Sequence, residues 1–235
     1  MRIMCVVALA WRAHPEFPLI LLGNRDEFYA RAAAPLGAWD DGSGVIAGRD
    51  LQAGGTWLGL HKPSGRSVVI TNVRGASPDP TKESRGALVT DLLRREGRFA
   101  DPAEPDLDRF NAFNLFTADA DGARLFTNRP APRISPLAPG IHALANEPAT
   151  SPCPRAALLG QLLSAAVSDG MDIAALFDAL AADAPPALFL NGELYGTRAS
   201  TLLTIDTEGR ARIAERRYEK GGRSTGTTAL ELRIG

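Results

Sequence analysis

The sequence predicts an α+β fold in which antiparallel strands are interrupted by a few helices. Short apolar runs come in pairs separated by turn residues, a pattern typical of β-hairpins. Longer amphipathic segments are few and do not alternate with single strands, as they would around a parallel sheet. The chain has 235 residues, 45% of them hydrophobic, which is enough for a large core. Because no change of composition marks a linker, we predict a single domain over residues 1–235.

The first two strands are predicted near the N-terminus. Ile3–Ala10 is apolar and bounded by charge, which favours a buried strand. Pro18–Gly23 is a second apolar run, and the turn-like residues 14–16 between the two indicate a hairpin. A secretory signal peptide is the alternative interpretation of the N-terminus. Because the apolar run stops at Trp11-Arg12, we favour the strand.

Three further hairpins are predicted, each with a glycine in or near its turn. Their strands are Thr56–Leu60 with Ser67–Thr71, Phe113–Ala118 with Arg124–Thr127, and Thr201–Asp206 with Ala211–Tyr218. Ile141–Ala145 is a lone apolar run and is predicted to be a single strand. The proline-rich polar stretches 76–82, 101–106 and 129–139 are predicted to be loops.

Three helices are predicted from apolar residues at helical spacing: Ser84–Arg95, Pro154–Val167 and Asp172–Ala182. Pro154 stands at the first helical position, where proline is favoured. The third helix ends before the Pro185-Pro186 pair, which cannot continue it.

Composition excludes several classes of function. Lys and Arg number 26 against 27 Asp and Glu, so the basic field that nucleic-acid binding requires is missing. No uncharged apolar run reaches the ~20 residues of a membrane span. Cys5 and Cys153, with the dispersed His14, His61 and His142, show no metal-ligand spacing, and we expect no metal. With few cysteines and no export signal, a cytoplasmic protein is predicted. Nothing in these patterns indicates an oligomeric state.

Cys5 is the first candidate for chemistry. A lone cysteine in a strand is most often a small buried hydrophobe. It becomes a nucleophile when a base or a positive field favours its thiolate, and an α-amino group of pKa about 7.7–8.0 is such a base. Cys5 would carry a free amine if translation began at Met4 or if residues 1–4 were removed. If Met1 is retained, that amine lies in a peptide bond and this mechanism fails.

Polar residues follow several of the predicted strands. Asn24-Arg25-Asp26-Glu27 follows the second strand, Asn72 and Asn146 each follow an apolar run, and Arg198 precedes one. An asparagine amide can donate to a developing oxyanion, and an arginine can hold a carboxylate with two hydrogen bonds. Taken alone, the segment 24–27 is equally compatible with a solvated turn, and residues such as Asn72, Asn146 and Arg198 are more often turn or cap residues.

Taken together, these residues resemble a known family. The matching segments occur in order along nearly the whole chain: Asn24–Phe28 with Arg31, Ala47–Asp50, Gly54–Gly59, Thr71-Asn72, Leu144–Asn146 and Tyr195–Arg198. They resemble the NRDE family, also called the transport and Golgi organisation protein 2 family. The resemblance implies an N-terminal-nucleophile hydrolase fold, a four-layer αββα sandwich of two antiparallel sheets between helix layers.

The NRDE family is similar in pattern to penicillin V acylases and bile-salt hydrolases, in which an N-terminal cysteine attacks an amide. Carried over by position, Cys5 would be the nucleophile and its own amine the base. Asp26 would hold that amine, with Arg25 nearby. Either Asn24 or Glu27 could take the place of Asp26, because the register within residues 24–27 is open.

The same resemblance implies that Asn72 is the oxyanion donor and that Asn146 and Arg198 complete the site. Trp57 is expected to line a substrate pocket, and His142 is a further candidate because it closely precedes Asn146. Cys153 stands where the family tends to carry tryptophan, so we expect it to be a packing substitution and not a second nucleophile.

The predicted function is that of a cysteine amidohydrolase or acyltransferase. A small amide or acyl compound would react through a Cys5 thioester, with no metal or organic cofactor. The alternative is a non-catalytic protein on the same fold that binds or carries a lipid, an acyl group or haem.

Overall fold

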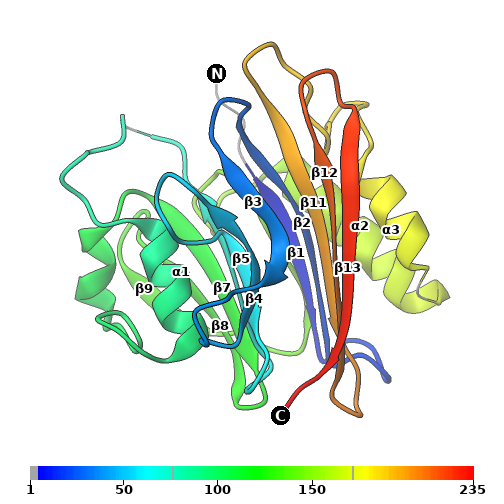
Figure 1. Cartoon of the computed structure of the whole chain (residues 1–235), viewed down its shortest axis with the longest axis horizontal. Coiled ribbons are helices and arrows are strands. Elements are labelled where there is room, and N and C mark those ends of the chain that lie inside the picture. Colours follow the sequence, from blue (N-terminus) through cyan, green and yellow to red (C-terminus); the bar gives the residue numbers. More distant parts are fainter. Residues whose placement is uncertain (1–4, 76, 171) are drawn as a thin grey trace.

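The computed structural model describes residues 5–75, 77–170 and 172–235. Two antiparallel sheets pack face to face, and helices cover the outer face of each sheet. The four layers follow one another across Figure 1, from α1 (Arg85–Arg94) on one side to α2 (Pro154–Asp169) and α3 (Ile173–Leu180) on the other. The α+β class and the αββα sandwich predicted from the sequence are therefore confirmed.

The first sheet has six strands in the order β10-β1-β2-β11-β12-β13. These are β1 (Val6–Trp11), β2 (Leu19–Phe28), β10 (Gly140–Leu144), β11 (Tyr195–Ile205), β12 (Arg210–Tyr218) and β13 (Ser224–Arg233). The predicted hairpin of β1 and β2 is present, and every residue of β1 is buried. Residues 3 and 4, with which the first predicted strand begins, lie outside the described residues.

The second sheet has seven strands in the order of the sequence. These are β3 (Ala33–Ala38), β4 (Val45–Asp50), β5 (Leu58–His61), β6 (Arg66–Asn72), β7 (Phe113–Asp119), β8 (Gly122–Thr127) and β9 (Arg133–Pro136). Each strand pairs with the next, so both predicted hairpins in this region are confirmed.

Four strands were not predicted: β3, β4, β9 and β13. Three of them are sheet edges, which bury only part of their side chains and therefore show a weak apolar pattern. The prediction of a loop over 129–139 was wrong at β9, and the predicted loop 101–106 overlaps a short 3-10 helix at Glu104–Arg109. The three predicted helices are present with ends shifted by one or two residues. Within the part of the chain that the structure describes, no helix is long and apolar enough to cross a membrane.

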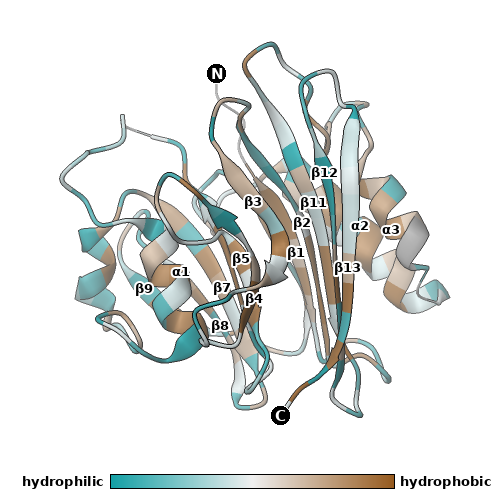
Figure 2. Cartoon of the chain, viewed as in Figure 1, coloured by the Kyte–Doolittle hydropathy of each residue, from teal (hydrophilic) through white to brown (hydrophobic). Residues whose placement is uncertain are grey.

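Three apolar cores hold the layers together: one between the sheets, one under α2 and α3, and one under α1. Figure 2 shows hydrophobic residues concentrated along β1 and the strands around it. Along β1, Val7 and Leu9 join the core between the sheets, whereas Val6 and Ala8 face α2 and α3. Because side chains alternate along a strand, Cys5 falls on the face that looks between the sheets.

Candidate functional site

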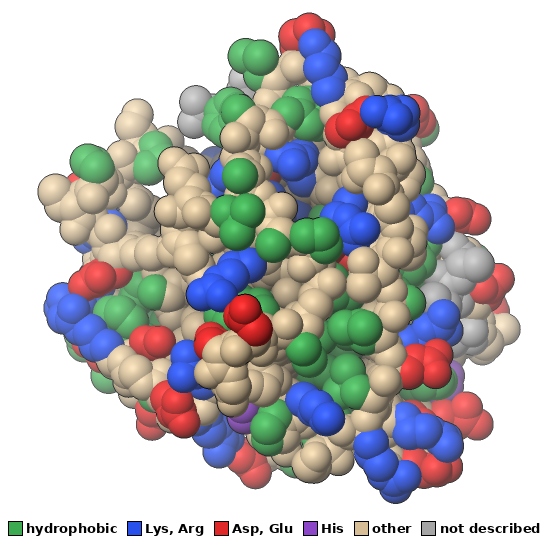
Figure 3. Space-filling model, viewed as in Figure 1, with side chains coloured by type: hydrophobic (Ala, Val, Ile, Leu, Met, Phe, Trp, Pro, Cys, Tyr) green, Lys and Arg blue, Asp and Glu red, His purple; other side chains and the backbone are tan. Residues whose placement is uncertain are grey.

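A cavity of about 600 Å³ lies between the two sheets, beside the residue that precedes β1. Its wall includes Cys5, residues 25–27 of β2, the end of β4 and the first residues of α1. Strands β11 and β12 contribute residues 198 and 199 and residues 215, 217 and 218. Figure 3 shows Lys and Arg side chains in the hollow between the sheets, in the upper half of the view. A cavity of this size accommodates a small organic ligand.

Cys5 is buried in the wall of this cavity, with 7% of its surface exposed. Its Sγ lies 3.9 Å from the backbone carbonyl oxygen of Asp26, to which the thiol donates. Burial raises the pKa of the Cys5 thiol to about 12, and the negative charge of Asp26 adds to this rise, while Arg25 opposes it. The thiol is therefore protonated at neutral pH and requires a base before it can attack a carbonyl group.

The segment Asn24–Glu27 belongs to β2, and its side chains alternate between two environments. Arg25 and Glu27 lie in the wall of the cavity. Asn24 and the carboxylate of Asp26 bond instead to groups on the helix side of the sheet. The four polar residues therefore serve two different surfaces, although they are consecutive in the sequence.

A small ion-pair network fixes the cavity face of this segment. Asp50 Oδ2 lies 2.6 Å from Arg31 Nε and 3.4 Å from Arg25 Nη2. Glu27 is within 3.9 Å of both arginines. Burial works against the charge of Asp50, but hydrogen bonds from Arg31 and the backbone hold the pKa of this carboxyl below its ordinary value. Asp50 is thus an anion that anchors two cations of the wall.

Asp26 accepts hydrogen bonds at both its carboxylate and its backbone oxygen. Its carboxylate accepts hydrogen bonds from Arg155 Nη2 at 2.9 Å and from Thr197 Oγ1 at 2.6 Å. Its backbone oxygen accepts from the hydroxyl of Tyr195 at 2.6 Å and from Cys5. Burial raises the pKa of Asp26, while Arg155 and Thr197 oppose that rise. These bonds hold the carbonyl that touches the thiol in one place.

Two further residues of the predicted motif at 195–198, Gly196 and Arg198, contact the chain at and after the end of β2. Arg198 Nη1 donates to the backbone oxygens of residues 28, 29 and 31 at 2.9–3.1 Å. Gly196 leaves room for Tyr29, because a Cβ at this position would collide with the tyrosine hydroxyl. The motif therefore positions the wall of the cavity through hydrogen bonds and close packing.

Most of the residues predicted for the site meet at the cavity: Cys5, Arg25, Asp26, Glu27, Trp57, Asn72 and Arg198 all border it. Asn146 is fully buried beside it, and its Nδ2 donates to the backbone oxygen of Asn72 at 3.0 Å. Asn146 is therefore placed to fix the position of Asn72.

Asn24 was named as an alternative to Asp26 and as a candidate for substrate binding, but it does not border the cavity. Its Nδ2 donates to the backbone oxygens of Leu180 and Leu188 at 2.8 and 2.9 Å, and its Oδ1 accepts from Ser200. The side chain connects β2 to the end of α3. Its orientation follows from strand alternation, because Asn24 and Arg25 point to opposite faces of the sheet.

His142 was also expected at the site and does not border the cavity. Its ring packs against Phe116 in the space between the sheets. Its Nε2 lies 2.8 Å from the backbone oxygen of Ala138. Its closeness to Asn146 in the sequence does not bring it to the cavity, because β10 is extended and separates residues by about 3.3 Å each.

The first turn of α1 is held against the cavity by a close contact between two glycines. A Cβ on Gly55 would lie 2.5 Å from the carbonyl carbon and oxygen of Gly86, so only glycine allows this approach. Ser84, Arg85 and Gly86 consequently border the cavity. Burial lowers the pKa of Arg85, and the charges of Cys5 and Glu27 oppose this, which puts its guanidinium within electrostatic reach of the thiol.

Sequence reasoning missed Arg155 and Arg85. Both stand in the first turn of a helix, where the helix dipole disfavours a cation. This unusual placement is a signal that a specific anion compensates the charge, and for Arg155 the compensating anion is Asp26.

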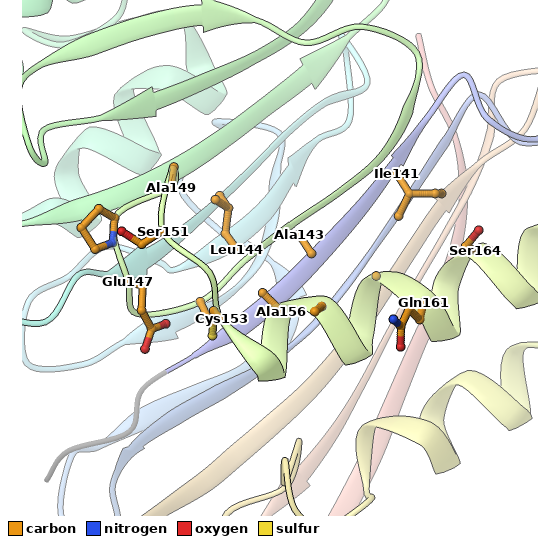
Figure 4. A pocket seen from close by; sticks show the side chains of 14 residues that line it. Ile141, Ala143, Leu144, Glu147, Ala149, Ser151, Cys153, Ala156, Gln161 and Ser164 are labelled. Carbon is orange, nitrogen blue, oxygen red and sulfur yellow. The ribbon is translucent and has the colours of Figure 1, made fainter.

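A second cavity of about 420 Å³ lies between β10 and α2 and does not include Cys5. Figure 4 shows Cys153 and Glu147 beside the first turn of α2. Burial raises the pKa of Cys153, and Glu147 contributes to the rise. Cys153 packs against the apolar core under α2, in the packing position predicted for it. Among the described residues, no group of three or more His, Cys, Asp and Glu could hold a metal ion.

Comparisons with known proteins agree with this architecture. The mouse and human homologues of Transport and Golgi organization protein 2 are 27% and 28% identical to the chain, and each alignment covers 91% of the chain and 92% of the homologue. A solved structure of the Caenorhabditis elegans orthologue of N-acylethanolamine-hydrolyzing acid amidase shares the fold, with a TM-score of 0.53 and 12% identity, over 85% of this chain and 92% of that one. The sequence pattern of Transport and Golgi organisation 2 matches residues 4–220, and the chain therefore belongs to the Transport and Golgi organisation 2 family.

Proposed function

We propose that this protein is a cysteine amidohydrolase or acyltransferase that acts on a small amide through a thioester on Cys5. The observation that carries the proposal is the position of Cys5, which directly precedes β1 and borders the cavity together with Arg25 and Asn72. The similar fold of an amidase supports the same reaction class.

The reaction requires a base for the thiol proton. The α-amine of Cys5 takes that proton when it is free, and Sγ attacks the amide carbonyl carbon. The oxyanion that forms accepts a hydrogen bond from the side-chain amide of Asn72. When the carbon–nitrogen bond breaks, the leaving amine takes the proton from the α-ammonium group. Water, or another acyl acceptor, then releases the acyl group from sulfur.

The state of residue 4 decides whether this base exists. While Met4 is joined to Cys5, the nitrogen is an amide and the thiol keeps its pKa of about 12. Removal of residues 1–4 would create an amine next to the thiol. The proposal therefore makes reactivity at neutral pH depend on the N-terminus.

We expect two forms of the protein to differ in thiol reactivity, both made with Cys153→Ala so that Cys5 is the only thiol. In the form that retains residues 1–4, alkylation by iodoacetamide should keep accelerating with pH throughout the range in which the protein is folded. The form that begins at Cys5 should be alkylated at neutral pH. It should also gain the mass of an acyl group from activated amides, and Cys5→Ala should abolish that gain.

Equal inertness of the two forms at neutral pH would contradict the proposal. Binding of acyl compounds by the form that begins at Cys5, with no acyl adduct and no turnover, would favour the carrier function instead. A haem carrier would show a visible absorption band on titration with haem.

A further inference from the structure

The carboxylates that border the cavity are already committed to cations. Glu27 and Asp50 pair with Arg25 and Arg31. Three more have partners of their own: Asp26 with Arg155, Glu215 with Arg217, and Glu83 with Arg98 and Arg109. The remaining one, Asp79, accepts hydrogen bonds from Thr81 that lower its pKa, and the charge of Lys82 lowers it further.

Three cationic side chains of the cavity wall are not in any of these ion pairs. Arg49, Arg85 and Arg198 border the cavity, and none has an ion-pair partner among the described residues. The residues outside the described ranges, 1–4, 76 and 171, include no Asp or Glu. The described wall of the cavity therefore holds more cationic than anionic side chains, and these three arginines are not held by a close carboxylate.

The N-terminus of α1 adds to this positive field. The first backbone N–H groups of a helix have no partner within the helix, and the helix dipole makes this end positive. The Ser84 side chain makes no capping hydrogen bond, and the first turn contains no acidic residue. Because Gly55 packs directly against Gly86, this helix end borders the cavity.

Two guanidinium groups of the wall each have one nitrogen without a hydrogen-bond acceptor among the described residues. Arg25 is only 9% exposed, and its Nη1 has no acceptor among the described residues. Nε of Arg198 is buried and lacks an acceptor in the same part of the chain. A buried donor without an acceptor costs free energy, which a ligand oxygen would recover.

We propose that the cavity binds an oxyanion group of its ligand, a carboxylate or a phosphate, between the N-terminus of α1 and the guanidinium groups of Arg25 and Arg85. Charge surplus, an uncapped helix end and unpaired arginine donors coincide at this place. This inference rests on the proposed function. The substrate class is then an amide that carries an oxyanion close to the bond that is cleaved, as an N-acyl amino acid does.

Binding is tested without turnover, in the Cys5→Ala protein, by calorimetry with three matched ligands. These are N-decanoylglycine, its neutral carboxamide, and N-decanoylaminomethylphosphonate. At least one of the two anionic ligands should bind more tightly than the carboxamide by about tenfold or more. The stronger of the two shows whether the site prefers a carboxylate or a phosphate. Equal affinity for all three, or no binding of any, would overturn the proposal.

Two substitutions locate the site. Ser84→Asp puts a carboxylate on the helix end, where it stabilises the helix but competes with the ligand. The melting temperature should stay the same or rise while the preference for the anion falls at least about tenfold. Arg85→Gln should also weaken the preference, whereas Arg94→Gln, which makes the same change of charge in the last turn of α1, should not. An unchanged preference in Ser84→Asp and Arg85→Gln would refute this placement.

The outcome is separable from that of the proposed function. If the form that begins at Cys5 never acylates, but the Cys5→Ala protein prefers the anionic ligands, the oxyanion site stands and the catalytic proposal fails. If neutral amides are cleaved as well as anionic ones, catalysis stands and the oxyanion site fails.

Discussion

At the scale of single residues, Asp26 connects the helix side of the first sheet to the thiol of Cys5. It lies on β2 with its carboxylate toward the helices and its carbonyl oxygen toward Cys5. Arg155 and Thr197 are the partners of the buried Asp26 carboxylate. Loss of a partner leaves a buried charge uncompensated, which costs several kcal/mol of stability. Because the same residue touches the thiol, a disturbance on the helix side is transmitted to the nucleophile.

The hydroxyl of Thr197 should contribute measurably to stability. In Thr197→Val the shape is nearly kept, but the carboxylate of Asp26 loses a 2.6 Å hydrogen bond. We expect the free energy of unfolding, measured with a chemical denaturant, to fall by about 1–3 kcal/mol. Thr201→Val on the same strand is the control, because Oγ1 of Thr201 is buried and has no partner among the described residues. This control should be neutral or slightly stabilising, and similar losses in both variants would contradict the assignment.

The sequence predicted which residues gather at the site better than it predicted their roles. Arg25, Asn72 and Arg198 were selected as polar residues at the ends of predicted strands, and all three border the cavity. Asn24 was misplaced because its function depends on which face of β2 meets the helices, and that is decided by packing far along the chain. The partner of Asp26, Arg155, lies 129 residues away, and no local pattern connects the two.

At the scale of elements, the placement of α1 is the decisive feature. The helix covers the outer face of the second sheet, yet its first turn reaches the cavity between the sheets. The glycine contact between residues 55 and 86 makes this possible. The helix itself was predictable from its apolar spacing, whereas the edge strands β3, β9 and β13 were not, because they have a buried neighbour on one side only.

Substitution of Gly55 by alanine should therefore destabilise the protein. The new Cβ would meet backbone atoms of Gly86 at 2.5 Å, and these can move only with the helix. We expect a loss of about 1–3 kcal/mol in the free energy of unfolding. Gly37→Ala serves as the control, because a Cβ there meets nothing within 4 Å, and it should change stability by less than about 0.5 kcal/mol. A neutral Gly55→Ala would show that α1 shifts freely.

At the scale of the whole molecule, the two sheets are joined by a polar contact as well as by their shared core. Glu215 belongs to β12 of the first sheet, and its Oε1 accepts the backbone N–H of Leu36 in β3 of the second at 2.9 Å. Only 5% of Glu215 is exposed. The fold class was predictable because strands of both sheets appear in the sequence as hairpins, in pairs of apolar runs separated by turn residues. A contact between the sheets was not predictable, because neither strand carries a sequence pattern that indicates its partner.

Replacement of Glu215 by glutamine tests the strength of this connection. Glutamine keeps an oxygen acceptor for Leu36 and loses the negative charge, so the hydrogen bond weakens. We expect the free energy of unfolding to fall by about 1 kcal/mol. Glu231→Gln is the matched control, because its side chain is 78% exposed and its ion pair with Arg212 spans 3.7 Å. The control should change stability by less than about 0.5 kcal/mol. No difference between the two variants would mean that the charge of Glu215 adds nothing to the connection between the sheets.

The alternation of side chains along β2 has a consequence for how such a protein can change over time. Asn24 and Asp26 serve the packing of the helix layer, and Arg25 and Glu27 serve the cavity. Substitutions at positions 25 and 27 therefore act first on the cavity wall and its ion pairs, while positions 24 and 26 stay under selection for folding. A designer who wishes to change specificity would begin with the odd-numbered pair.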